Sequence, residues 1–181
     1  YSADQVIEKL QSYSSLRPLV VGEAILDEYC YATPLAKAPR EAIIAARYES
    51  IEVFGGGAIA TANHLAGFCD RVTLVTPVGE DEDHFRTITA SLRSNVDLVP
   101  IVTPGRTTIR KRRFLEPGHL TKLFEIQYID DRDLSEEPER QAAAELTRLM
   151  PDHDLAVVND FGHGFMTSKL RDLVSNSPTF L

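Results

Sequence analysis

Short apolar runs alternate with stretches of helical spacing along most of the chain. A continuous apolar run that ends at a turn is typical of a strand buried on both faces of a parallel sheet. Such runs occupy residues 18–22, 71–75, 96–102 and 155–159, and helical patterns occupy residues 3–14, 83–94, 135–150, 167–174 and the Ala-rich stretch after Gly57. The alternation of strand and helix predicts an α/β core with a mostly parallel sheet.

Two segments, about 28–54 and 106–129, break this alternation. The first contains Pro34 and Pro39 and then alternates from Ile43 to Phe54, which predicts extended strands with a solvated face. The second predicts two antiparallel strands, 107–115 and 121–129, joined at a Pro-Gly turn. We expect these segments to form a small β lid beside the core.

The composition of the chain indicates which binding partners and which cellular compartment to expect. The chain has 181 residues, 43% of them hydrophobic, which suits one globular domain. Its net charge of −8 argues against nucleic acid and against an anionic membrane surface as partners. Cys30 and Cys69 lie far apart without metal-ligand spacing, so we predict no metal site and a reducing compartment, the cytoplasm.

The last residues, 175–181, resemble the start of a further strand. A parallel sheet that lacked its edge would expose apolar surface, so we expect this chain to be part of a longer domain. No apolar run approaches the length of a membrane-spanning helix, and the N-terminal residues lack a signal-peptide core.

Asp27 is the first candidate for chemistry, because it follows the buried run 18–22. Ligands of open α/β sheets bind beyond the carboxyl ends of the strands, where a carboxylate can accept hydrogen bonds from vicinal sugar hydroxyls. The alternative role for Asp27 is a helix or turn cap. Gly56 and Gly57 come before a helix, where glycine lets the backbone approach a ligand closely.

The same glycines also fit a dinucleotide fingerprint. Gly55, Gly57 and Ala60 satisfy G-x-G-x-x-G/A. However, the residues before them alternate instead of forming a buried strand, and the next strand ends at Thr76-Pro77 without an acidic residue to hold a ribose. A nicotinamide-binding domain is therefore the weaker hypothesis.

Two further motifs carry charge. In a strand over Arg110–Arg113, Lys111 and Arg113 share one face, where they could hold a phosphate; a solvated strand that resists edge pairing is the alternative. Asp160 and His163 follow the buried run 155–159, so they belong to the same rim as Asp27. Asp160 could bind a hydroxyl or help to position a metal and His163 could meet an anion, or the motif is simply a glycine-containing turn.

Taken in order, these motifs resemble the ribokinase-like (PfkB) carbohydrate kinases, and most closely the heptose-7-phosphate kinase domain of ADP-heptose synthases. The matching segments span nearly the whole chain: residues 20–27, the glycine turn with its Ala-rich helix, 72–81, 108–113 and 160–164. The resemblance implies a three-layer α/β core, a β lid that closes over the sugar, and in many members a homodimer formed through that lid.

The resemblance also implies roles for single residues. Asp27, Gly56 and Gly57 would contact sugar hydroxyls, Lys111 and Arg113 would lie near a substrate phosphate, and Asp160 would stand near the reacting end. We also count His163 and Asn63 among the substrate-binding candidates. His163 replaces the family's lysine, and Asn63 is the nearest asparagine because Ala60 occupies the place of the family's early asparagine. Two further residues differ from the family pattern: Glu23 stands where the heptose kinases have aspartate, and Glu125 stands where a basic residue is common. A related sugar or sugar phosphate therefore fits as well as a heptose phosphate. The family's catalytic base and ATP site lie in a late motif that would follow Leu181, so we assign no catalytic residue here.

These observations predict that the parent protein is an ATP- and Mg²⁺-dependent sugar or sugar-phosphate kinase. This chain would be its substrate-binding half (residues 1–181, a partial kinase domain), inactive by itself. The alternative is a kinase-fold module that binds a sugar as a sensor without phosphorylating it, which the changes at Ala60 and His163 motivate.

Overall fold

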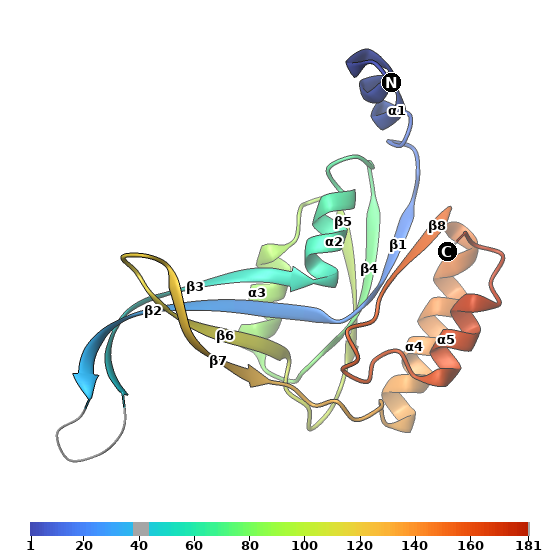
Figure 1. The fold of residues 1–181 in the computed structure, drawn as a ribbon. Coiled ribbons are helices and arrows are strands. Elements are labelled where there is room, and N and C mark those ends of the chain that lie inside the picture. Colours follow the sequence, from blue (N-terminus) through green and yellow to red (C-terminus); the bar gives the residue numbers. More distant parts are fainter. Residues whose placement is uncertain (38–43, 181) are drawn as a thin grey trace.

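The first sheet forms the centre of the molecule. The structure, a computed structural model, describes residues 1–37 and 44–180. Within them four parallel strands follow the order β5-β4-β1-β8 (Figure 1). The strands are β1 Pro18–Gly22, β4 Val72–Val78, β5 Val96–Val102 and β8 Leu155–Asn159, so the prediction of a mostly parallel core sheet is confirmed.

Helices cover both faces of this sheet. Val20 of β1 packs toward the small residues of α2, whereas its neighbours Leu19 and Val21 pack toward α4 and α5, and all three side chains are fully buried. The helices are α1 Ala3–Gln11, α2 Ala58–Leu65, α3 Glu82–Ser91, α4 Glu136–Leu149 and α5 Ser168–Ser175, with a short 3-10 turn at Met150–Asp152. The predicted three-layer α/β architecture is therefore confirmed.

A second sheet projects from the core (Figure 1). Its order is β3-β2-β6-β7, with β2 parallel to β6 and the two outer pairs antiparallel. The strands are β2 Ala24–Lys37, β3 Ile44–Gly57, β6 Ile109–Glu116 and β7 Thr121–Tyr128. Pro39 and Ile43, which we used to predict extended strands, lie outside the described residues.

The boundary between the sheets differs from the sequence prediction in one respect. β2 begins at Ala24, so only Glu23 separates it from β1. Asp27, which we predicted to lie just beyond the first buried strand and before the lid segment 28–54, therefore lies inside a strand of the second sheet. The chain can pass directly between sheets here because Glu23 is itself fully buried and its carboxylate accepts hydrogen bonds from the backbone N–H groups of Phe161 (3.0 Å) and Phe165 (3.4 Å).

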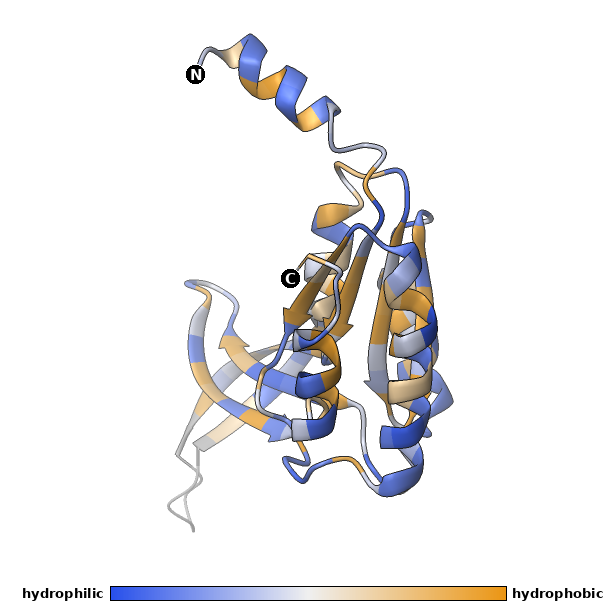
Figure 2. Cartoon of the chain, turned by 90° about the vertical axis from the view of Figure 1, so that its right-hand side faces the viewer, coloured by the Kyte–Doolittle hydropathy of each residue, from blue (hydrophilic) through white to orange (hydrophobic). Residues whose placement is uncertain are grey.

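The two ends of the chain are less enclosed. α1 stands away from the core, and its apolar stripe is not buried (Figure 2). At the other end, Phe180 forms an isolated parallel bridge with Leu155 at the edge of β8. No described helix is long and apolar enough to cross a membrane.

Candidate functional site

The face of the second sheet that carries Asp27 collects charged side chains from two strands. Asp27 in β2 lies directly beside Lys111 in β6, and residues paired in register point to the same face of a sheet. Arg113, two residues further along β6, reaches back so that its Nη1 donates to Oδ1 of Asp27 at 2.5 Å. The prediction that Lys111 and Arg113 share a face is thus consistent with the register. We call these three residues the charged face.

Arg113 is held between two carboxylates. Its Nε lies 2.8 Å from Oε2 of Glu125 in β7, in addition to the contact with Asp27. The hydrogen bond that Arg113 donates to Asp27 raises the pKa of Arg113, and the charges of both carboxylates add to the effect. In the described part of the chain, Lys111 has no such acidic partner. Together with Glu125 the charged face is therefore neutral overall, and Lys111 is its one cationic group without an ion pair among the described residues.

The glycines approach this face closely. Gly56 lies beside Asp27, and a Cβ atom on Gly56 would overlap the Asp27 carboxylate. Gly57 has a positive φ of 58° and comes directly before α2, and a Cβ atom there would overlap the carbonyl oxygen of Glu23. Gly56 is buried and Gly57 is half-buried, so backbone and carboxylate lie in close contact here, with no room for a side chain at either glycine.

Two aromatic rings border the charged face, and sequence reasoning missed them. Phe54 in β3 pairs with Asp27, is 52% exposed, and packs edge-to-face against Tyr29 at 5.6 Å between ring centroids. Arg113 also lies over the Tyr29 ring at 5.5 Å. The period of two along β2, which places residues 27 and 29 on one face, was the signal that would have found Tyr29.

Three of the predicted residues do not join the charged face. Asn63 uses its amide to hold the end of α3: Nδ2 donates to the Ser91 carbonyl at 2.7 Å and Oδ1 accepts from the Arg93 N–H at 2.9 Å. Asp160 pairs with Arg171 of α5 at 3.1 Å. His163 pairs with Asp131 at 2.7 Å, with only 11% of its side chain exposed.

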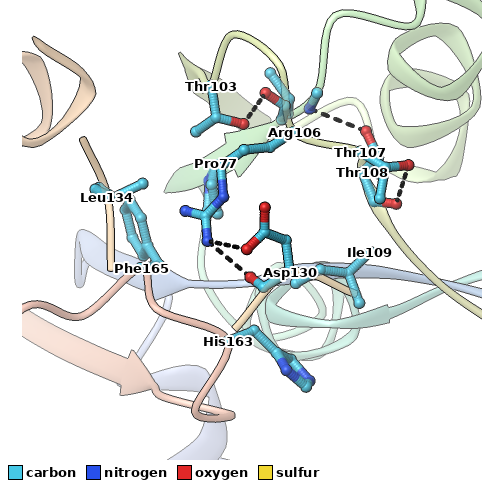
Figure 3. A pocket seen from close by; sticks show the side chains of 12 residues that line it. Pro77, Thr103, Arg106, Thr107, Thr108, Ile109, Asp130, Leu134, His163 and Phe165 are labelled. Carbon is cyan, nitrogen blue, oxygen red and sulfur yellow. Dashed lines mark hydrogen bonds and ion pairs between the residues drawn. The ribbon is translucent and has the colours of Figure 1, made fainter. Parts of the chain in front are cut away.

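His163 borders a small pocket where three loops meet. Arg106 and Asp130 lie in this pocket, together with backbone of the β4 end (Figure 3). Its volume is about 20 Å³, enough for a single water molecule and too small for a sugar. Hydrogen bonds from Arg132 and Arg106 hold the pKa of Asp130 well below its usual range. This pocket is therefore too small for a substrate, and the charged face is the candidate ligand surface.

The described residues hold no cluster of three or more His, Cys, Asp or Glu side chains that could bind a metal ion.

Comparisons with known proteins identify relatives of this chain. It is 29% identical over 175 residues to the bifunctional protein HldE of Trichlorobacter lovleyi, which covers 96% of this chain and 35% of that protein. The bifunctional protein HldE of Rhodopseudomonas palustris is 29% identical over 159 residues, covering 84% and 31%. The chain thus spans about a third of the length of these relatives. No family model matches it.

Solved structures show the same fold. Phosphofructokinase-2 of Escherichia coli, in complex with fructose-6-phosphate, matches with a TM-score of 0.60 at 17% identity, over 90% of this chain and 50% of that one. A carbohydrate kinase from Agrobacterium tumefaciens matches with a TM-score of 0.51 at 19% identity, over 79% and 45%. The predicted resemblance to ribokinase-like carbohydrate kinases and ADP-heptose synthases is confirmed, and so is the ribokinase-like fold.

Proposed function

We propose that this chain, a relative of HldE with the fold of a sugar kinase, is the substrate-binding half of an ATP-dependent sugar or sugar-phosphate kinase. The observation that carries the proposal is the charged face, where Asp27 and Lys111 are adjacent beside the backbone of Gly56. A heptose-phosphate-like substrate is favoured because the sequence relatives are HldE proteins.

The charged face offers separate groups for the two ends of such a substrate. The Asp27 carboxylate and the backbone near Gly56 suit sugar hydroxyls, and the exposed ring of Phe54 suits the apolar face of a sugar ring. The ammonium group of Lys111 is a compact donor for a phosphate. In this proposal ATP and Mg²⁺ serve the parent protein and are bound by groups outside the described residues.

The proposal extends to assembly and compartment. The opposite face of the second sheet carries an apolar groove of about 330 Å³ that includes Phe114 and Phe124, with Phe124 54% exposed. We propose that a second copy of the protein covers it, and sedimentation velocity measures whether a dimer forms. Cys30 and Cys69 are both free thiols, which suits the cytoplasm.

A sensor without kinase activity is the second candidate. It is favoured by His163, which stands in place of the family's lysine and is occupied by Asp131. Both candidates require a sugar-phosphate site on the charged face, so binding is tested first and turnover separately.

Calorimetric titration of the chain tests this site, with a heptose 7-phosphate and the same heptose without its phosphate as probes. We expect the phosphorylated probe to bind more tightly, and Lys111→Met to weaken it by about tenfold or more, because a charge-assisted hydrogen bond is lost. Lys9→Met removes a lysine of α1, which stands away from the second sheet, and is the matched control. Equal affinity of the two probes, or an equal effect of the two variants, would remove Lys111 from the site.

A further inference from the structure

Arg106 lies where the hairpin of β6 and β7 joins the core. The segment 103–108 leads into this hairpin and the segment 129–135 leads out of it. The Arg106 guanidinium donates to the carbonyl oxygens of Asp130, at 2.7 Å, and of Arg132, and it pairs with the Asp130 carboxylate at 3.4 Å (Figure 3). Only 13% of the Arg106 side chain is exposed. One buried side chain therefore connects the two ends of the hairpin.

The entering segment is itself fixed to the first sheet. Thr103 donates from its N–H and from its hydroxyl to the carbonyl oxygen of Val78 at the end of β4, both at 2.9 Å. The Gly79 N–H donates to the hydroxyl of Thr108 at 3.0 Å. Arg106 thus extends from a segment that is hydrogen-bonded to the core. Its own contacts connect the segment after β7 to that fixed segment.

We infer that Arg106 is a positioning residue that holds the hairpin so that Lys111 and Arg113 stay beside Asp27. We call the contacts of Arg106 with Asp130 and Arg132 the clasp. Lys111 pairs with Gln127, which is three residues before Asp130, so the clasp lies close to the charged face. The assignment rests on the proposed function insofar as the charged face binds a sugar phosphate.

Arginine suits this role because of its geometry. Its planar guanidinium carries five N–H donors in a fixed fork, whereas a lysine offers one ammonium group. Without arginine, the carbonyl groups of Asp130 and Arg132 would lose this donor in a pocket with space for about one water molecule, and the Asp130 carboxylate would keep only Arg132.

Hydrogen exchange measured residue by residue tests the clasp without any ligand. In Arg106→Met we expect amides of β6 and β7 to exchange about tenfold faster, while amides of β1 and β4 stay within about twofold. Arg106→Lys should recover part of the protection. Arg148→Met is the control, since Arg148 pairs with Glu145 on the exposed surface of α4.

Equal hairpin exchange in Arg106→Met and Arg148→Met would overturn the clasp. If circular dichroism shows Arg106→Met to be unfolded, Arg106→Lys decides the question by the same comparison with wild type. Titration with the heptose 7-phosphate then tests positioning: we expect about tenfold weaker binding in Arg106→Met, with Lys111 intact. A loosened hairpin with unchanged affinity would overturn the positioning role. Failure of the wild type to bind would overturn the proposed function and that role together, whereas the exchange experiment alone decides whether Arg106 fixes the hairpin.

Discussion

Replacing Glu28 by alanine is expected to lower the free energy of unfolding by about 3–5 kcal/mol, because it breaks a buried ion-pair cluster. Glu28 lies in β2 on the face opposite Asp27, with 7% of its side chain exposed. Its carboxylate pairs with Arg110 at 3.3 Å and with Arg112 at 2.5 Å. Arg110 also lies over the ring of Tyr128 at 4.0 Å. Removing Glu28 leaves two partly buried guanidinium groups without a counter-charge.

Urea unfolding of the variant and of Glu137→Ala provides the measurement. Glu137 pairs with Arg140 on α4, where both side chains are about 70% exposed, so its loss should cost under about 1 kcal/mol. Comparable losses for the two variants would show that the Glu28 cluster does not stabilise the second sheet.

Gly164→Ala is the second change with a large expected effect. Gly164 has a φ of 78°, and a Cβ atom there would overlap the carbonyl oxygen of Arg132. The left-handed backbone costs a non-glycine residue about 1–2 kcal/mol, and the overlap with fixed backbone adds about 1–3 kcal/mol. The same carbonyl accepts from Arg106, so the shift would also disturb the clasp.

Gly162→Ala is a matched control two residues away in the same loop. Gly162 has the same φ of 78°, but a Cβ atom there meets no atom within 4 Å. Its variant therefore reports the backbone cost alone. We expect the melting temperature to fall more in Gly164→Ala than in Gly162→Ala, and equal shifts would contradict the close approach of the two loops.

The core was predictable because its signals are local. The apolar runs 18–22 and 155–159 match β1 and β8 residue for residue, since strands buried on both faces need no polar alternation. The Pro-Gly turn and the alternation along Arg110–Arg113 likewise placed the hairpin and divided its charges between two faces. Arg110 and Arg112 pair with Glu28, whereas Arg113 pairs with Asp27.

Long-range contacts were not predictable in this way. Sequence placed Asp27 between the first buried strand and the lid segment 28–54, because nothing in residues 22–27 shows that one buried glutamate is enough to separate two strands. The partners of Asn63 and His163 lie about thirty residues away in the chain, at Ser91, Arg93 and Asp131. Arg106 belongs to no sequence motif. The role that we infer for it rests on its contacts with residues 130 and 132, which only the folded structure brings near it.

Phosphorylation by the full-length protein that contains this chain tests the central claim most directly. The assay follows ATP consumption with Mg²⁺ against hexoses, heptoses and their phosphates, for wild type and for Asp27→Ala with a matching melting temperature. We predict turnover with a sugar or sugar phosphate of the heptose-phosphate type, reduced at least about a hundredfold in Asp27→Ala as hydroxyl positioning is lost. Saturable sugar binding without turnover of any compound would contradict the kinase assignment and establish the sensor instead.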